Sequence, residues 1–197
     1  KDHTVPGDFS SAAFLLAAAA VTSSRVTVNR LEYQTSQGDR AIVGVLEEMG
    51  AAVKIGDDSV EVEGGQLVGV DIDAKDIPDL VPVCAVLGCY AEGRSEIYNA
   101  KRLRYKESDR LDSVSTELKK MGADIIVNED GLTINGSCSL HGATVDPHND
   151  HRIAMACAVA ALGADGETKI QNIECINKSY PQFFSDLRLL GANVVGI

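Results

Sequence analysis

The sequence has no tryptophan, only 5% aromatic residues and few basic side chains, with 18 Lys and Arg against 29 Asp and Glu and a net charge of −11. This shortage of positive charge argues against broad binding to nucleic acid, which needs a basic face. The longest apolar run, residues 12–21, falls short of the roughly 18 residues that span a membrane. We therefore expect a cytoplasmic protein with neither nucleic acid nor membrane as a partner.

Cysteines are few and scattered, and they form neither a CxxC motif nor a His-flanked cluster. Their odd number and apolar surroundings indicate reduced thiols in the core, so we predict no disulfide and no structural metal. The five are Cys84, Cys89, Cys138, Cys157 and Cys175.

What positive charge there is gathers in residues 101–110 (KRLRYKESDR), which hold five of the 18 basic side chains. Ser108 or Asp109 can cap a helix over residues 111–121, which places Arg110 in its first turn beside free backbone N–H groups. This arrangement predicts a site for a small anion. The alternative is an ordinary solvated helix start.

A Met/Leu-Gly-Ala signature ends a helical pattern three times, with its glycines at 50, 122 and 191, spaced by 72 and 69 residues. Each glycine is a predicted helix C′ residue. Alternating β-branched residues follow each one and predict strands over residues 52–55, 124–127 and 193–195. The first two pair as hairpins with residues 60–63 and 132–135.

Each copy also begins with an aspartate ahead of an apolar helix, at Asp8, Asp79 and Asp150, separated by 71 residues each time. These first helices (residues 12–21, 80–90 and 153–162) are apolar on nearly every face and so should be buried, whereas the second helices (residues 41–49 and 111–121) are amphipathic. We predict an α/β fold, a single pseudo-threefold domain over residues 1–197. Its three β-α-β-α-β-β repeats (about 4–66, 67–139 and 140–197) keep helices inside and sheets outside.

Four clusters stand at the helix starts: residues 76–79 (DIPD), 105–110 (YKESDR), 149–155 (NDHRIAM) and 177–181 (NKSYP). Together, in this order, they resemble the C-terminal half of the 5-enolpyruvylshikimate-3-phosphate synthase family, and the likeness runs from Val5 onward. The resemblance implies the inside-out α/β barrel of the enolpyruvyl transferases, with the active site in a cleft between two such domains. The N-terminal domain of that architecture is absent from this sequence.

The family transfers the enolpyruvyl group of phosphoenolpyruvate to the 5-hydroxyl of shikimate 3-phosphate and releases phosphate, in the shikimate pathway of aromatic amino-acid biosynthesis. The resemblance thus implies two anionic small-molecule substrates and no cofactor. Lys and Arg side chains at helix N-termini suit such polyanions.

The resemblance also implies a role for each matching residue. Asp79 corresponds to the general base, with a plain helix cap as its alternative, and Glu107 to a proton-transfer group, with a capping carboxylate as its alternative. Lys106 corresponds to a contact with shikimate 3-phosphate near the reacting hydroxyl. Phosphoenolpyruvate contacts correspond to Arg110, Arg152 and Lys178, and His151 is a possible supporting residue. Arg102 departs from the Asn of many members and is left out.

Two other functions stay open. A sister enolpyruvyl transferase acts on UDP-N-acetylglucosamine with the same architecture, although it lacks the joint KESDR and NDHRIAM pattern. The chain on its own can instead be a non-catalytic phosphate-binding domain, since it would hold only about half of the active site. We expect the full-length enzyme to be a transferase and the isolated chain to be inactive.

Overall fold

The computed structural model describes residues 5–196. Two ends of the predicted repeats, residue 4 of the first and residue 197 of the third, lie outside the described residues, as do the outermost residues of the predicted domain 1–197. Within the described range the chain forms three successive groups of helices and strands.

The first group has a helix, a strand, a second helix and a hairpin. Its elements are α1 (Phe9–Val21), β1 (Arg25–Asn29), the 3-10 turn η1 (Gly38–Ala41), α2 (Ile42–Glu48), β2 (Ala52–Ile55) and β3 (Ser59–Glu63). The strands form an antiparallel sheet in the order β1-β3-β2. The predicted hairpin is confirmed, with Val53 opposite Val62.

The second group shows the complete predicted element order, β-α-β-α-β-β. It comprises β4 (Asp71–Asp73), η2 (Pro78–Leu80), α3 (Val81–Tyr90), β5 (Arg94–Tyr98), η3 (Lys101–Tyr105), α4 (Arg110–Lys120), β6 (Asp124–Asn128) and β7 (Gly131–Asn135). The sheet order is β4-β5-β7-β6, in which β4 and β5 are parallel and the other pairs are antiparallel.

The third group is the shortest. It contains β8 (Thr144–Val145), α5 (His151–Gly163), β9 (Lys169–Ile170), η4 (Ile173–Lys178) and α6 (Phe183–Leu189), and β8 pairs in parallel with β9. The predicted strand over residues 193–195 is wrong, because this segment is irregular. No strand pairs with it among the described residues, and the Val194 carbonyl instead accepts two hydrogen bonds from the Arg188 guanidinium, at 3.1 and 2.9 Å.

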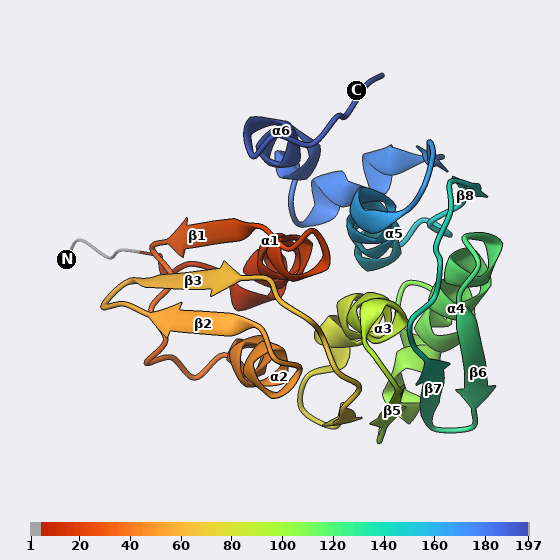
Figure 1. Ribbon diagram of the computed structural model, residues 1–197, viewed down its shortest axis with the longest axis horizontal. Helices are drawn as coiled ribbons and strands as arrows, with labels where there is room; N and C mark the ends of the chain where they lie inside the picture. The colour runs from red at the N-terminus through yellow and green to blue at the C-terminus, as the bar shows by residue number, and fades with distance from the viewer. Residues whose placement is uncertain (1–4, 197) are drawn as a thin grey trace.

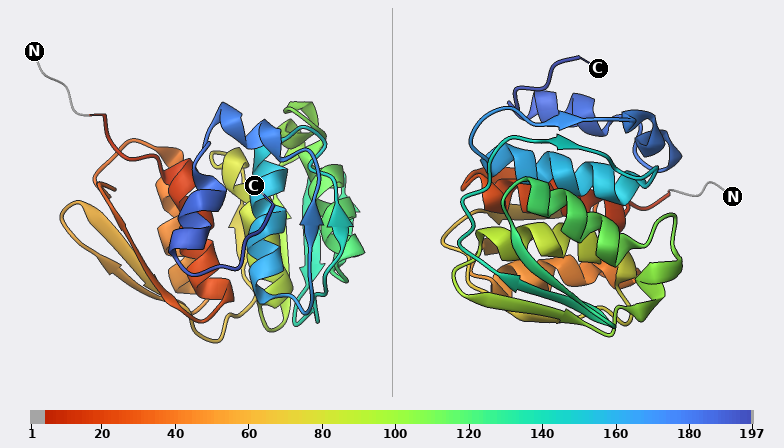
Figure 2. Two further views of the ribbon diagram at one scale, coloured as in Figure 1. Left: turned by 90° about the horizontal axis from the view of Figure 1, so that it is seen from above. Right: turned by 90° about the vertical axis from the view of Figure 1, so that its right-hand side faces the viewer.

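Helices lie inside and sheets outside, as predicted. The central helices α1, α3 and α5 contact one another in pairs, and they run side by side through the interior while the strands form the outer layers (Figures 1 and 2). The three are apolar around their whole circumference because none of their sides faces water. Most of their residues are fully buried within one continuous apolar cluster.

The three signature glycines end the second helices α2, α4 and α6. Gly50, Gly122 and Gly191 adopt φ values of 97°, 97° and 104°, in the left-handed region that glycine enters without strain from a Cβ atom. This confirms their prediction as C′ residues. Each glycine turns the chain sharply away from its helix, and in the first two groups that turn leads directly into the outer hairpin.

Candidate functional site

The N-terminal ends of four helices meet at one face of the molecule. Arg152, in the first turn of α5, donates from Nη1 to the Ser10 carbonyl on α1 at 2.7 Å. Arg110, the first residue of α4, contacts both Asp150 at the start of α5 and Asp79 in the 3-10 turn that precedes α3. We call the group formed by Asp79, Lys106, Glu107, Arg110, Asp150 and Arg152 the charged cluster.

Arg110 is the centre of this cluster. Its Nε donates to Asp150 at 2.8 Å, its Nη1 to Asp79 at 2.5 Å and its Nη2 to Glu107 at 2.7 Å. The side chain is only 2% exposed and the Asp150 side chain is fully buried. A buried guanidinium surrounded by three carboxylates stays charged. The structure thus joins Arg110 to Asp79 and Glu107, two other predicted site residues.

The helix start that holds Arg110 follows the prediction. Asp109 is the N-cap of α4 and accepts from the Asp112 backbone N–H at 3.3 Å. Arg104 in turn donates to Asp109 at 2.9 Å and to the Asn128 carbonyl at 2.8 Å, which ties η3 to the β6–β7 turn. Part of the basic run therefore stabilises the fold, and only Lys106 and Arg110 enter the charged cluster.

Asp79 does not cap a helix, although its repeat position matches two aspartates that do. Asp8 accepts from the backbone of Ser10 and Ser11 at the start of α1, and Asp150 accepts from the Arg152 backbone at the start of α5. Asp79 instead lies inside η2, and α3 begins without a side-chain cap. The capping alternative for Asp79 is thus wrong, and its carboxylate is available to the charged cluster.

Three cations surround the Asp79 carboxylate. Besides Arg110, Lys106 Nζ lies 3.5 Å from Oδ1 and Arg152 Nη2 lies 3.9 Å from Oδ2. Burial by itself raises the pKa of Asp79, but Arg110, Arg152 and Lys106 outweigh it and hold the pKa below the ordinary value. Asp79 is therefore ionised at neutral pH.

A second carboxylate, which the sequence analysis did not single out, supports Arg152 from behind. Ser10, whose carbonyl holds Arg152, donates its hydroxyl to Asp39 in a short hydrogen bond. Burial raises the pKa of Asp39, the Ser10 hydroxyl opposes this rise, and the nearby Asp79 adds to it. Arg152 Nε is buried without a hydrogen-bond partner, so this guanidinium keeps unused donor capacity.

The other predicted site residues lie around this core. Glu107 has 35% of its side chain exposed and Lys106 has 30%, so both reach solvent. Lys178 is exposed at the end of η4, with Nζ 3.4 Å from the Asn149 carbonyl, and it precedes α6 by several residues. His151 is buried with Nδ1 unpaired, and its pKa is lowered by burial and then by Arg152.

The loop that carries Asn149 and Asp150 depends on a buried glutamate that the sequence analysis missed. Glu117 on α4 is fully buried and accepts from His148 Nε2 at 2.8 Å, from the Asp146 backbone at 2.9 Å and from Lys120 at 2.7 Å. His148 and Asn149 have φ values of 53° and 57°. Glu117 thus holds a left-handed turn immediately before α5. The available signal was an acidic residue on the apolar stripe of a helix.

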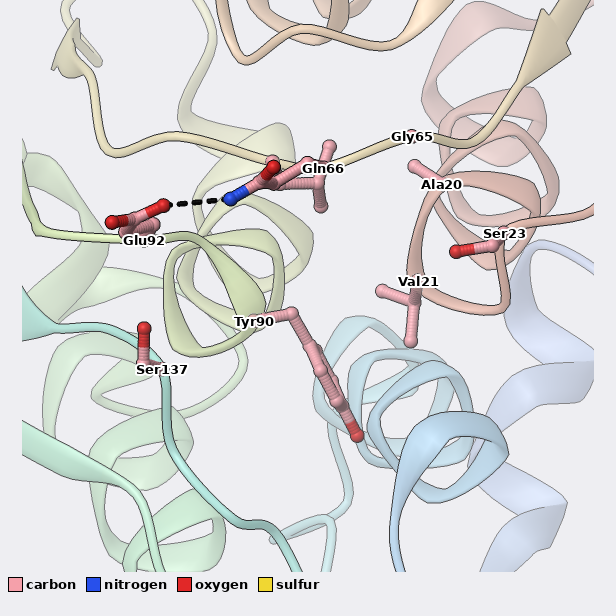
Figure 3. Close-up of a pocket in the computed structure, with 9 residues that line it drawn as sticks. Ala20, Val21, Ser23, Gly65, Gln66, Tyr90, Glu92 and Ser137 are labelled. Carbon is pink, nitrogen blue, oxygen red and sulfur yellow. Dashed lines mark hydrogen bonds between the residues drawn. The ribbon is translucent and has the colours of Figure 1, made fainter.

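The largest cavity described lies elsewhere. It has a volume of about 350 Å³ and is lined by residues near the C-terminal ends of α1 and α3, among them Val21, Tyr90 and Ser137 (Figure 3). Tyr90 closes one side by donating its hydroxyl to the Ala160 carbonyl at 2.6 Å. No residue of the charged cluster reaches this cavity, so the two features lie at opposite ends of the central helices.

Two searches of the described residues, 5–196, returned nothing. No group of three or more His, Cys, Asp or Glu side chains there could hold a metal ion. None of the helices in that range is long and apolar enough to cross a membrane. The charged cluster is a set of cations and carboxylates at helix N-termini, which can bind small anions and move protons.

The chain matches the family EPSP synthase (3-phosphoshikimate 1-carboxyvinyltransferase) over residues 1–187. It belongs to the EPSP synthase family. The 3-phosphoshikimate 1-carboxyvinyltransferase of Methanocella arvoryzae is 56% identical over 195 residues, which cover 98% of this chain and 46% of that relative. The enzyme of that name from Methanocaldococcus jannaschii is 48% identical over 194 residues, covering 98% and 45%. This EPSP synthase family chain therefore spans about half the length of the curated relatives it matches.

Solved structures agree with the fold. EPSP synthase from Acinetobacter baumannii superposes with a TM-score of 0.84 at 28% identity, covering 94% of this chain and 46% of that one. The enolpyruvyl transferase NikO from Streptomyces tendae has a TM-score of 0.78 at 24% identity, covering 98% of this chain and 45% of that one, and bears on the fold alone. The inside-out α/β fold expected for this EPSP synthase family chain is thus confirmed.

Proposed function

We propose that the chain is the C-terminal half of an enolpyruvyl transferase. The full-length enzyme transfers the enolpyruvyl group of phosphoenolpyruvate to the 5-hydroxyl of shikimate 3-phosphate and releases phosphate. The observation that carries this proposal is the convergence of Asp79, Arg110 and Arg152 at helix N-termini, since the reaction needs anion contacts beside a proton acceptor. The names of the relatives favour this substrate over UDP-N-acetylglucosamine.

In this proposal Arg110, Arg152 and Lys178 bind the carboxylate and phosphate of phosphoenolpyruvate. Arg152 has an unpaired Nε and Lys178 is exposed, so both can accept an anion without losing a carboxylate partner. Arg110 has no such freedom, because three carboxylates occupy it. Glu107 is the one that can exchange for substrate, since Asp150 is fully buried while 35% of the Glu107 side chain is exposed.

Asp79 is the proposed general base that removes the proton from the 5-hydroxyl, with Lys106 beside it to contact the shikimate 3-phosphate. A base with a lowered pKa is weak until its surroundings change. Anionic substrates supply that change, because they neutralise the three cations that hold the pKa of Asp79 down. The effect of burial then prevails, and the pKa rises toward the working pH.

Glu107 is the proposed proton-transfer group for the methylene carbon of the enolpyruvyl moiety. Once substrate displaces it from Arg110, its carboxylate is free to take up and deliver a proton. His151 supports the site through its position, since it is buried between Asp150 and Arg152, with Nδ1 4.0 Å from Asp150 Oδ1. The reaction passes through a tetrahedral adduct, and loss of phosphate from it restores the enolpyruvyl double bond.

The remaining contacts in this proposal come from an N-terminal domain of the same enzyme. The chain spans about 45% of its relatives, and we propose that its three repeats form one domain whose charged cluster faces that partner across a cleft. Alone, the chain should bind phosphoenolpyruvate weakly and show no turnover. We also propose a cytoplasmic location, which is supported by five cysteines that are all free within the described range.

The test compares Asp79→Asn with Asp8→Asn in the full-length enzyme. Asparagine caps a helix about as well as aspartate but cannot accept the proton. The Asp79 change should lower turnover by roughly 10² to 10⁴ while substrate binding is retained, and the Asp8 change should have little effect. Near-normal turnover of the Asp79 variant at saturating substrate would show that the base lies elsewhere, with Glu107 as the next candidate.

A further inference from the structure

One of the five cysteines has surroundings unlike those of the others. Cys138 follows strand β7 and is partly exposed, whereas the other four are buried. It lies against Cys89, the residue before the last one of α3, and its backbone N–H donates to the Cys89 carbonyl at 2.9 Å. Neither residue belongs to the charged cluster, which lies at the other end of α3.

Backbone hydrogen bonds hold the two cysteine-bearing segments in register. Next to the Cys138 bond, Ser137 N–H donates to the Ala91 carbonyl at 2.7 Å and Gly136 N–H to the Gly93 carbonyl at 2.8 Å. Residues joined by such bonds have Cα atoms roughly 5 to 6 Å apart. Disulfides span about 4.4 to 6.8 Å between Cα atoms, so the backbone needs no large movement to bring the two sulfur atoms together.

The two thiols also differ in reactivity. Hydrogen bonding with the Cys89 thiol is the main influence that lowers the pKa of Cys138 to about 6; burial and Asp124 oppose it, while the Asp124 backbone N–H, 3.5 Å from the sulfur, assists. The same interaction raises the pKa of Cys89. Cys138 is thus the accessible nucleophile, and Cys89 is the buried, protonated partner.

The other cysteines lack these properties. Cys84 and Cys157 are 1% and 0% exposed, and burial raises the pKa of each to about 12. Cys175 is also buried, and burial raises its pKa. An oxidant in solution therefore meets one reactive thiol, and that thiol has a second one beside it. The cavity lined by Tyr90 and Ser137, which adjoin Cys89 and Cys138 in sequence, opens at this end of the molecule (Figure 3).

We propose that Cys138 and Cys89 form a reversible thiol–disulfide couple that responds to peroxide. The Cys138 thiolate attacks one peroxide oxygen, the O–O bond breaks, and the leaving hydroxide takes up a proton to become water, which leaves a sulfenic acid on Cys138. The Cys89 sulfur then attacks that sulfur, forming the S–S bond and expelling a second water. The two thiols lose two electrons and two protons, and a dithiol reductant reverses the change.

This bond would connect the end of a central helix to the segment that leaves the outer sheet. In a reducing compartment such a pair stays open and closes only under oxidation, which is the usual behaviour of redox-sensing cysteines. Because the bond restricts the unfolded chain, the oxidised form should have the higher melting temperature. The inference depends on the chain alone and not on the proposed transferase activity.

The experiment treats the purified chain with hydrogen peroxide, blocks the remaining thiols with N-ethylmaleimide and measures intact mass and tryptic peptides. We expect three of the five thiols to remain alkylatable, a cross-linked pair of peptides containing Cys89 and Cys138, and full reversal by dithiothreitol. Cys89→Ser should leave a sulfenic acid on Cys138 that dimedone traps, whereas Cys138→Ser should abolish both products.

Cys175→Ser is the matched control and should form the same cross-link as the parent chain. Circular dichroism verifies that each variant is folded. Failure to find the Cys89–Cys138 peptide pair in the folded parent chain would overturn the proposal. A cross-link to another cysteine, or a Cys138-linked dimer in place of the internal bond, would overturn it as well.

Discussion

Replacing Arg110 by methionine tests the central feature of the charged cluster. Arg110 is 1% exposed and contacts three carboxylates, one of which, Asp150, is fully buried. Methionine fills the aliphatic part of the space but leaves Asp150 with only the Arg152 backbone N–H at 2.9 Å and the Ser108 hydroxyl at 3.2 Å. Since breaking a buried ion pair from one side costs about 3–5 kcal/mol, the free energy of unfolding should fall by that amount.

Thermal unfolding of the chain followed by circular dichroism measures the effect. For a chain of this length the loss corresponds to a decrease in Tm of about 6 to 20 °C at pH 7. Arg25→Met is the matched control, because Arg25 makes a 2.6 Å ion pair with Glu63 but its side chain is 60% exposed. Exposed pairs contribute little, so the Tm of this control should stay close to that of the parent.

The effect of pH has a definite sign. The pKa of Asp79 is lowered in the folded chain, because the cations outweigh burial. Its contribution to stability is therefore present above the ordinary value of 3.8 and is lost as the pH falls through the lower folded value. In the Arg110→Met variant the uncompensated carboxylates take up protons as the pH falls, so the difference in Tm from the parent should shrink toward pH 4. An equal difference at both pH values, or one no larger than the Arg25→Met control shows, would refute this account.

Three further changes have expected outcomes. Arg152→Ala in the full-length enzyme should weaken phosphoenolpyruvate binding roughly 10- to 150-fold, as expected for a lost charged hydrogen bond, with less effect on shikimate 3-phosphate; equal losses in calorimetry would contradict the assignment. Glu117→Gln should destabilise the chain by about 1.5 to 3 kcal/mol at pH 7 and by less near pH 4, because burial raises the pKa of Glu117 but Lys120 and its other donors outweigh it; urea unfolding at the two pH values checks this. Gly122→Ala should cost about 1 to 2 kcal/mol at a φ of 97°, whereas Gly44→Ala, with open space around its added Cβ, should stabilise α2 by about 0.5 to 1 kcal/mol; the same sign for both would be inconsistent with the left-handed C′ position.

The sequence alone was enough to predict the repeated elements, because their signals are local. The predicted first helices, residues 12–21, 80–90 and 153–162, are close to α1, α3 and α5. Apolar residues on all sides require burial, and glycine at a helix end permits the left-handed turn, whatever the distant partners are. For the same reason the cap at Asp109 and the two hairpins were predictable.

Pairing between distant segments was decided only by the tertiary structure. The β-branched residues 193–195 predict a strand, yet a strand needs a neighbour, and Arg188 satisfies the Val194 carbonyl instead. Asp8, Asp79 and Asp150 share one spacing, but Asp79 alone lies inside a 3-10 turn and faces Arg110. Sequence spacing specifies a place along the chain, whereas the direction of a side chain depends on what packs around it.

The charge state of the site also came from the three-dimensional arrangement. The sequence indicated a concentration of positive charge around Arg110, but the folded chain surrounds that guanidinium with carboxylates from three separate segments. Glu117 gave only a weak signal, an acid on an apolar stripe, and its contacts with residues 146 and 148 appear only when α4 packs beside the loop before α5. Electrostatic interactions act through space, so their partners and their effects on pKa depend on the tertiary fold.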